Sequence, residues 1–292
     1  MIVGIGELLW DIFPDGRKVA GGAPFNFAFH CQQLGHEATI VSRVGDDELG
    51  RQLREEVKRL GMSDEFIQTD FEHPTGTVRV TVDAGGQPSY QIVEDVAWDY
   101  IEWDSSLESL NRTMEALCFG TLASRRRTTR ESIERLSGHW SSRTEPALIV
   151  CDINLRPTGP DEFFIHWAKT RCDWLKLNHE ELIELSRGLE PSEFGKEVSV
   201  RIVTRGSQGC TVFAFGETIH EPPVPARVVD TVGAGDAFTA AMVCLTLEGR
   251  SLQECARFAN HYAARVCEHQ GGTPRIDRAD VKRSVITGER GA

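Results

Sequence analysis

The sequence lacks the signatures of several protein classes. No GxxxxGK(S/T) segment occurs, which excludes a Walker-type nucleotide site, and neither HExxH nor GxSxG is present. Gly4 and Gly6 are not followed by the third glycine of a dinucleotide-binding fingerprint, and Glu7 stands where the phosphates would lie. These absences argue against a Rossmann-type oxidoreductase.

Cysteine pairs, long apolar runs and excess positive charge are also missing. None of the eight cysteines forms a CxxC pair, so no zinc site is expected, and their scatter through apolar runs predicts buried free thiols and a cytoplasmic protein. No apolar run approaches the ~18 residues of a membrane span. The apolar start is interrupted by Glu7 and has no cationic segment before it, which predicts a strand rather than a signal peptide. The net charge of −12 disfavours nucleic acids and anionic membranes as partners.

The most informative stretch runs from Asp230 to Phe238, where two carboxylates flank a turn of small residues and an apolar helical run, 237–247, follows. Such a turn leaves backbone N–H groups unpaired at a helix N-terminus, where the helix dipole favours anions. Gly233 and Gly235 let the backbone approach a phosphate closely. Asp236 beside that anion site suits the base of a phosphoryl transfer to a hydroxyl, although an ordinary N-capping Asp is the alternative.

Two earlier stretches place polar side chains near expected strand ends. Residues 2–9 predict a buried strand with Asp11 just past its end, where ligands of open α/β sheets lie. Gly22 precedes a helical pattern that continues to about residue 35, and Asn26 lies in its first turn. Asp and Asn suit a polyol, whose hydroxyls both donate and accept hydrogen bonds. A solvated loop Asp and a helix-start Asn are the alternatives.

A change of period indicates a β-hairpin outside the main sheet. Alternation at 77–82 and 88–93 with Gly85-Gly86 between them is typical of such a hairpin, which can cover a site and exclude water. Elsewhere strands and helices alternate. Strands are predicted at 38–44, 116–119, 147–151, 174–177, 200–204 and 210–214, and helices at 51–60, 237–247, 252–269 and from about 277. The run Arg125–Arg127 is interpreted as a solvated helix start.

Asn178 and Glu181 follow the strand predicted at 174–177 and lie three residues apart, so they share one helix face. Such a pair can hold a hydrated Mg²⁺ together with its phosphates. The alternative is that Asn178 caps the helix and Glu181 completes a capping box, and from this stretch alone the alternative is favoured.

Together these motifs resemble those of the ribokinase-type (PfkB) carbohydrate kinases along nearly the whole chain. One motif, residues 21–26, leads into 42–50, and the other, 230–238, lies about 200 residues later, with Asn178-x-x-Glu181 and Thr204-Arg205-Gly206 between them in the family's order. The resemblance implies an α/β fold, with a doubly wound, mostly parallel sheet, helices on both faces and a small β lid. It also implies a single kinase domain over residues 1–292, with lid segments inserted at about 10–24 and 75–103.

The resemblance assigns roles by position. Asp236 is similar to the catalytic base, and the N–H groups of Gly233, Ala234 and Gly235 to the anion hole. The positions similar to sugar-binding residues are Asp11, Gly22, Asn26 and Arg156. Those near the nucleotide are Thr204, Gly206 and Gly209, with Asn260 beside adenine. Asn178 and Glu181 match the Mg²⁺ and phosphate motif, whereas Asp230 and Gly271 match the place of a monovalent cation, K⁺.

Within the family, residues 6–11, 21–26 and 152–157 look most like those of fructokinases. The implied activity is ATP-dependent phosphorylation of a primary hydroxyl of a ketohexose, D-fructose to fructose 6-phosphate, with Mg²⁺. A 2-keto-3-deoxygluconate kinase is the nearest rival, and its carboxylate substrate would need a bidentate Arg. Another sugar or nucleoside kinase and a non-enzymatic sugar- or nucleotide-sensing relative are further alternatives. The implied partners are the sugar and ATP, and the edges of the lid hairpin could pair two subunits into a homodimer.

Overall fold

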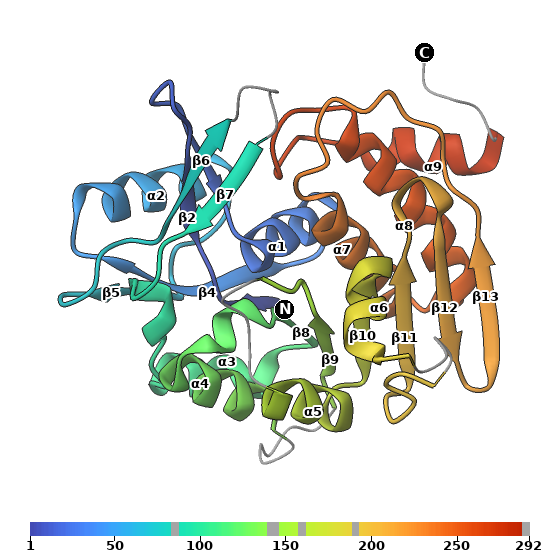
Figure 1. The fold of residues 1–292 in the computed structure, drawn as a ribbon, viewed down its shortest axis with the longest axis horizontal. Helices are drawn as coiled ribbons and strands as arrows, with labels where there is room; N and C mark the ends of the chain where they lie inside the picture. Colours follow the sequence, from blue (N-terminus) through green and yellow to red (C-terminus); the bar gives the residue numbers. More distant parts are fainter. Residues whose placement is uncertain (83–87, 139–145, 157–161, 189–192, 288–292) are drawn as a thin grey trace.

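The computed structural model describes residues 1–82, 88–138, 146–156, 162–188 and 193–287. Within these residues a nine-stranded sheet has the order β13-β12-β11-β10-β9-β8-β1-β4-β5 (Figure 1). Its strands are β1 (Ile2–Ile5), β4 (Ala38–Gly45), β5 (Ile67–Asp70), β8 (Ala116–Gly120), β9 (Leu148–Asp152), β10 (Trp174–Asn178), β11 (Val200–Thr204), β12 (Cys210–Ala214) and β13 (Glu217–Glu221). Within this sheet, only the two described pairs that include β12 are antiparallel, and the other described pairs are parallel.

Helices cover both faces of this sheet, which confirms the doubly wound α/β fold. One core joins the sheet to α1 (Ala23–Gln33), α7 (Ala234–Leu247), α8 (Leu252–Cys267) and α9 (Arg278–Thr287). A second core, on the other face, joins it to α3 (Ser105–Thr113), α4 (Arg127–Ser137), α5 (Glu162–Arg171) and α6 (His179–Ser186). Helix α7 is apolar on nearly all sides and therefore lies among its neighbours, with Ala237 to Leu245 buried. This burial fixes the first turn of α7 in space.

A second, four-stranded sheet has the order β3-β2-β6-β7. Its strands are β2 (Leu9–Ile12), β3 (Lys18–Gly21), β6 (Thr77–Val82) and β7 (Pro88–Ile92). β6 and β7 pair antiparallel, which confirms the predicted hairpin, and its Gly85-Gly86 turn lies outside the described residues. Helix α2 (Glu48–Arg59) packs through Leu53 and Val57 into the core beneath this sheet.

The first predicted strand is in fact two strands. β1 ends at Ile5, and the chain turns out of the main sheet at Gly6, whose φ is +141°. It then pairs with β3 and β6 as β2. A Cβ at Gly6 would lie 2.8 Å from the Cβ of Ala123, so only glycine fits this crossing. Asp11 consequently lies inside β2 of the small sheet and not just beyond a main-sheet strand, contrary to the prediction.

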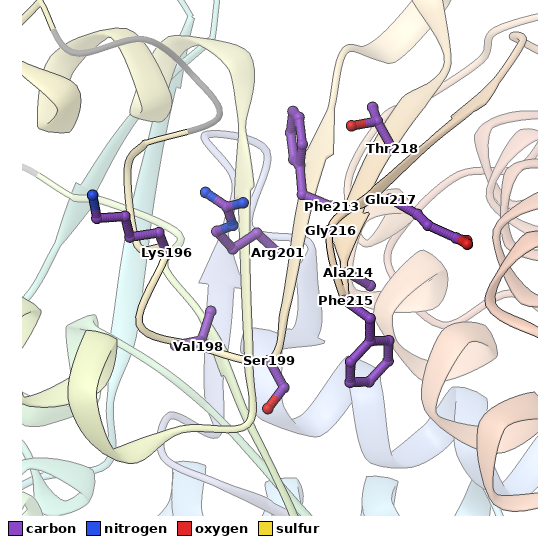
Figure 2. A pocket seen from close by; sticks show the side chains of 10 residues that line it. All are labelled: Lys196, Val198, Ser199, Arg201, Phe213, Ala214, Phe215, Gly216, Glu217 and Thr218. Carbon is purple, nitrogen blue, oxygen red and sulfur yellow. The ribbon is translucent and has the colours of Figure 1, made fainter.

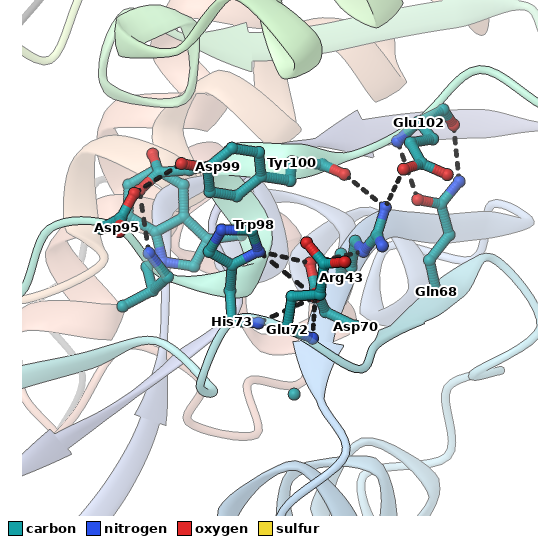
Figure 3. Close-up of polar contacts among 12 residues, drawn as sticks. Arg43, Gln68, Asp70, Glu72, His73, Asp95, Trp98, Asp99, Tyr100 and Glu102 are labelled. Carbon is teal, nitrogen blue, oxygen red and sulfur yellow. Dashed lines mark hydrogen bonds and ion pairs between the residues drawn. The ribbon is translucent and has the colours of Figure 1, made fainter.

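A polar cluster fixes the chain where it passes from β5 towards the small sheet (Figure 3). The buried carboxylate of Asp70 accepts hydrogen bonds from the backbone amides of Glu72 and His73. Arg43 of β4 forms an ion pair with Asp70 at 2.9 Å and donates to the Tyr100 carbonyl at 2.7 Å. The His73 ring stacks on Tyr100 with centroids 3.7 Å apart. These contacts hold the segment that leads from β5 to β6 against the main sheet.

The interpretation of Arg125 as a solvated residue is wrong. It ends the short helix η2 (Leu122–Arg125) with its side chain only 6% exposed, next to the buried Asp99 at 2.6 Å and above the Trp98 ring at 4.2 Å. A second short helix, η1 (Ala97–Tyr100), supplies both partners. Arg127 is 90% exposed, as predicted. Arg125 therefore belongs to a buried ion pair.

All eight cysteines are free thiols, and all but Cys267 are buried. This confirms the expectation of unpaired thiols in apolar surroundings. Among the helices that the structure describes, none is both long and apolar enough to cross a membrane.

Candidate active site

A cavity of about 1140 Å³ opens between the small sheet and the carboxyl ends of β10 and β11. Most of the predicted site residues line it. They are Asp11, Gly22, Asn26, Arg156, Asn178, Glu181, Thr204, Asp230, Gly233, Gly235 and Asp236. Five others do not line it, namely Gly206, Gly209, Ala234, Asn260 and Gly271. The fold thus brings residues from both ends of the chain to one site.

Asp236 lies in the first turn of α7, which starts at Ala234, three residues before the predicted start. Gly233 is the N-cap residue with φ of +77°, and no side chain caps this helix, so the alternative of an N-capping Asp236 is wrong. The carboxylate instead faces the cavity. Desolvation is the main cause that raises its pKa to about 6, and the nearby charge of Asp152 adds to the rise.

Asn26, from the first turn of α1, holds Asp236 in place. Its Nδ2 donates to Oδ2 of Asp236 at 2.8 Å, and this hydrogen bond lowers the pKa of that carboxyl. The side chain of Asn26 is 4% exposed, and its Oδ1 has no hydrogen-bond partner among the described residues. Asn26 is therefore close enough to orient Asp236 and retains a free acceptor.

The turn before α7 presents backbone donors to the cavity. The amides of Gly233, Gly235 and Asp236 have no hydrogen-bond acceptor within the described part of the chain, whereas the Ala234 amide donates to the Thr231 carbonyl at 3.3 Å. A Cβ at Gly233 would lie 2.5 Å from the Cα of Gly272, which explains the need for glycine there. The first turn of α7 thus offers the unpaired amides that bind anions at helix N-termini.

Asp11 and Asp230 both line the cavity. Burial is the main cause that raises the pKa of Asp11 to about 6, and the charge of Asp230 raises it further. Asp230 accepts hydrogen bonds from the Gly271 amide at 2.9 Å and the Val232 amide at 3.1 Å. The structure thus joins Asp230 to Gly271, the pair predicted together from the sequence.

Glu7 is a cavity residue that the sequence interpretation did not select. It is 3% exposed, and its Oε2 has no hydrogen-bond partner among the described residues. Desolvation raises the pKa of Glu7 to about 7, although Arg156 acts to lower it. A Cβ at Gly22 would lie 2.1 Å from the Glu7 carbonyl oxygen, so glycine at position 22 permits this packing. The sign in the sequence that could have identified Glu7 was a carboxylate within the apolar stretch 2–9.

Lys176 is a second residue that was not selected, and Asp152 pairs with it. Nζ lies 3.0 Å and 2.9 Å from the two carboxylate oxygens of Asp152, and both residues are buried. Lys176 lines the cavity. Its position between two leucines of an apolar strand was the only sign of it in the sequence.

Asn178 and Glu181 form the capping box that the sequence offered as an alternative. Asn178 Oδ1 accepts from the Glu181 amide at 2.9 Å, and Glu181 Oε2 accepts from the Asn178 amide at 2.7 Å. Glu181 Oε1 accepts from the Leu155 amide at 2.8 Å. In the described chain no three His, Cys, Asp or Glu side chains are grouped to ligate a metal directly. Each oxygen keeps a second lone pair, so the pair fits a hydrated cation as an outer hydrogen-bond acceptor.

The residues predicted near the nucleotide lie at one corner beside the cavity. Thr204 ends β11 and lines the cavity, and Gly206 starts the short helix η3 (Gly206–Gln208). Gly209 has φ of +82°, and a Cβ there would meet the Glu221 carbonyl oxygen at 2.2 Å. Asn260 donates to the adjacent Pro222 carbonyl at 3.0 Å. Gly209 and Asn260 therefore contact the same turn, outside the cavity itself.

Arg156 is exposed at the cavity and donates to its own neighbour, the Leu155 carbonyl, at 2.9 Å. Its charge lowers the pKa values of both Glu7 and Asp236. Arg156 is thus near enough to act electrostatically on two cavity carboxylates.

A smaller hollow of about 390 Å³ lies around β12 and β13 (Figure 2). Its wall contains Arg201, whose guanidinium lies 5.0 Å from the centre of the Phe213 ring, and the 83% exposed Phe215. None of the residues predicted from the motifs lines this hollow. The larger cavity is therefore the candidate active site.

The fold and the site are those of a small-molecule kinase, in which a carboxylate lies beside a helix N-terminus with unpaired amides at the edge of a doubly wound sheet. The family model of pfkB family carbohydrate kinases matches residues 12–278, and the chain belongs to this family. The predicted family is confirmed.

Similar proteins agree with this class. An uncharacterized sugar kinase of Pyrococcus horikoshii is 31% identical over 303 residues, covering 95% of this chain and 94% of the relative. Its structure in complex with ATP aligns with a TM-score of 0.80 at 29% identity, covering 98% and 100% of the two chains. A fructokinase of Klebsiella pneumoniae is 26% identical over 260 residues, covering 82% of each chain. A Vibrio cholerae fructokinase with bound fructose, ADP and potassium has a TM-score of 0.81 at 19% identity, covers 97% of each chain, and thereby supports the fold alone.

Proposed function

We propose that this chain transfers the γ-phosphoryl group of ATP to the primary hydroxyl of a ketohexose, converting D-fructose into fructose 6-phosphate. The observation that carries the proposal is the position of Asp236, held by Asn26 at 2.8 Å, in a helix turn whose amides are unpaired in the described chain. A base next to an anion site is the arrangement that phosphoryl transfer to a hydroxyl requires. The similarity to a Klebsiella fructokinase supports the choice of sugar.

In the proposed reaction, Asp236 accepts the proton of the attacking hydroxyl while the sugar oxygen bonds to the γ-phosphorus and the bond to the ADP oxygen breaks. Asn26 keeps the carboxylate oriented through its 2.8 Å hydrogen bond. The amides of Gly233 and Gly235 hold the transferred group, and Ala234 supports the same turn. Asp11 accepts hydrogen bonds from sugar hydroxyls, and Gly22 gives the sugar access beside Glu7.

The proposed nucleotide site extends from Thr204 over Gly206 and Gly209 to Asn260. Asn178 and Glu181 would hold Mg²⁺ through its water and the phosphates, because their oxygens already serve as acceptors and line the cavity. Bound Mg²⁺ supplies neutralisation of phosphate charge. Asp230 and the turn at Gly271 are the proposed site of K⁺, which the Vibrio fructokinase structure contains.

The charge of the cavity favours a neutral sugar over a sugar acid. Six carboxylates line it, on Glu7, Asp11, Glu94, Glu181, Asp230 and Asp236, against the two cations of Arg156 and Lys176. Lys176 is already paired with Asp152. A keto-acid would depend on Arg156 alone for its carboxylate, in a site where like charges repel it. Arg156 is therefore proposed to contact the sugar or the transferred phosphoryl group.

The test is ADP release from Mg·ATP with D-fructose, 2-keto-3-deoxygluconate, ribose and adenosine, followed by ³¹P NMR of the product. Turnover chiefly on fructose, with the phosphate on C6, is expected. Turnover chiefly on the keto-acid would refute the proposed sugar but retain the kinase mechanism. ATP binding without turnover on any sugar would refute the kinase proposal in favour of a sensor. Asp236→Asn is the matched control and should lose on the order of 10²–10⁴ in kcat while still binding ADP.

The remaining proposals concern the lid, the oligomeric state and the cellular location. The four-stranded sheet would act as a lid from the segments at about 10–24 and 75–103, within one domain. Its edge strands β3 and β7 would also pair two subunits in a homodimer, which light scattering can test. The free thiols support a cytoplasmic location.

A further inference from the structure

Lys176 is a buried cation in the wall of the candidate active site. It lies on β10, between β9 and β11, and its side chain is 8% exposed. Burial acts against its charged form, but the charge of Asp152 more than compensates, and the pKa of Lys176 is raised. Lys176 therefore remains an ammonium group despite its desolvation.

Its partner Asp152 is hydrogen-bonded to α7, the helix that carries the proposed base. Oδ2 of Asp152 accepts a hydrogen bond from Thr239 Oγ1 at 3.0 Å, in addition to the contact from Lys176 at 2.9 Å. Thr239 lies on α7, three residues after Asp236, and its single hydroxyl hydrogen is shared between Asp152 and the Gly235 carbonyl, which also lies 3.0 Å from Oγ1. The ammonium is thus fixed relative to the turn that carries the proposed base.

The location of this ammonium is electrostatically unusual. A Cβ on Gly235 would lie 3.0 Å from Nζ, so the cation stands directly beside the N-terminus of α7. The helix dipole disfavours cations at this end and favours anions. Two of the three ammonium hydrogens can be accounted for by Asp152, and the third has no acceptor within the described residues. A cation and unpaired amides therefore converge on one part of the cavity.

We infer that Lys176 contacts the phosphoryl group during its transfer, and that Asp152 is a positioning residue that holds the ammonium for this contact. The inference rests on the proposed function. The free N–H of Lys176 donates to an oxygen of the transferred group while the Gly233 and Gly235 amides bind its other oxygens. The contact involves no covalent change at Lys176. Negative charge shifts during transfer, so a preorganised cation stabilises the transition state more than bound ATP or ADP.

The experiment compares wild type, Lys176→Met, Asp152→Asn and the double variant on whichever sugar the wild type phosphorylates. Lys176→Met should lower kcat on the order of 10²–10³-fold. The KM for the sugar and the Kd for ADP should each change less than about threefold, because neither interaction contains the transferred group. Asp152→Asn should lower kcat less than Lys176→Met does, because the ammonium is still present but less well oriented.

The double variant separates catalysis from structure. It removes both buried charges, so it should recover thermal stability relative to either single variant but not recover kcat. Binding of ADP with aluminium fluoride and the sugar should weaken in Lys176→Met far more than binding of ADP alone. Recovery of kcat in the double variant, or equal weakening of both complexes, would overturn the inference.

A matched control distinguishes loss of folding from loss of catalysis. Arg278→Met breaks a half-buried ion pair, with Glu248, and neither residue lines the cavity or belongs to the proposed lid segments. It should lower stability but leave the kcat of the folded protein unchanged. If the wild type phosphorylates no sugar, the proposed function fails, whereas an active wild type with an active Lys176→Met variant refutes only this inference.

Discussion

Asn26 and Asp236 are separated by 210 positions in the chain, yet Nδ2 of Asn26 lies 2.8 Å from Oδ2 of Asp236. The contact joins the first turns of α1 and α7. This hydrogen bond directly connects the glycine-containing motif at residues 21–26 with the one at residues 230–238. The orientation of the proposed base therefore depends on Asn26, a residue that the sequence predicted to bind the sugar.

Asn26→Ala should shift the pH dependence of the reaction upward. The hydrogen bond from Asn26 lowers the pKa of Asp236, so its removal raises that pKa above about 6. The base acts when deprotonated, and kcat/KM rises with pH through its pKa, so the variant should lose more activity at pH 6 than at pH 8. Profiles of kcat/KM between pH 5 and 9 measure this. An acidic limb that stays in place or moves to lower pH would contradict the assignment.

Glu7→Gln should change how stability depends on pH. The folded-state pKa of Glu7 is about 7, above its ordinary 4.5, so between these values the folded state binds more protons than the unfolded state. The free energy of unfolding therefore falls as pH rises through this window, by about 3 kcal/mol in total. Gln removes this dependence and should make the protein more stable than wild type at pH 8.

Urea unfolding at pH 5 and pH 8 measures the effect of Glu7→Gln. Glu65→Gln is the control, because it makes the same chemical change at a side chain that is exposed to solvent. An identical pH dependence in wild type and Glu7→Gln would show that Glu7 is not the buried titrating group.

Gly233→Ala should disrupt the site, whereas Gly249→Ala should not. Both glycines have φ of +77°, so both substitutions pay the cost of left-handed backbone, about 1–2 kcal/mol. At Gly233 the new Cβ would also meet the Cα of Gly272 at 2.5 Å, whereas at Gly249 nothing lies within 4 Å. We expect both variants to lose Tm, Gly233→Ala more because of this backbone contact, and we expect a large loss of kcat in the folded Gly233→Ala variant alone. Equal activities of the two folded variants would argue against a tight turn at the anion site.

Asp230→Asn should abolish a response to K⁺. Asp230 holds the Gly271 turn through a 2.9 Å hydrogen bond, and its charge would attract the cation. Wild-type activity in KCl should exceed that in choline chloride at equal ionic strength, and the variant should show the same low activity in both. The variant should also lower the pKa of Asp11, because the Asp230 charge helps to raise it. Equal wild-type activity in the two salts would exclude a functional K⁺ site.

Periodicity predicted most of the main sheet but not its two edges. β5 and β13 lie at opposite ends of the nine-stranded order, and neither was predicted. β13 has the sequence Glu-Thr-Ile-His-Glu, in which only Glu221 is buried, and among the described strands it pairs with β12 alone. An edge strand buries little, and its apolar pattern is correspondingly weak. The division of residues 2–9 into β1 and β2 was also missed. Buried residues continue without a break through the turn at Gly6, so the apolar pattern gives no sign that the chain passes from one sheet to the other.

The parts of the candidate site that were predicted are those formed by short continuous motifs. The Asp230–Asp236 turn and the residues around Asn26 fall where expected, because short glycine-rich segments determine their own backbone. Glu7 and Lys176 were not selected, because the role of a charge within an apolar stretch depends on the residues that face it from distant parts of the chain. Asn178 and Glu181 illustrate the reverse case, since their capping box follows from spacing alone.

The central position of β1, between β8 and β4, has a consequence for biosynthesis. The residues around the cavity range from Glu7 to Gly272. The site can therefore form only after nearly the whole chain has been synthesised, long after Glu7 has left the ribosome. Synthesis at ~5–20 residues per second makes this wait tens of seconds. Throughout that time the apolar side of α1 that will meet α7 has no partner, so the nascent chain is most exposed to misassembly just where its function will reside.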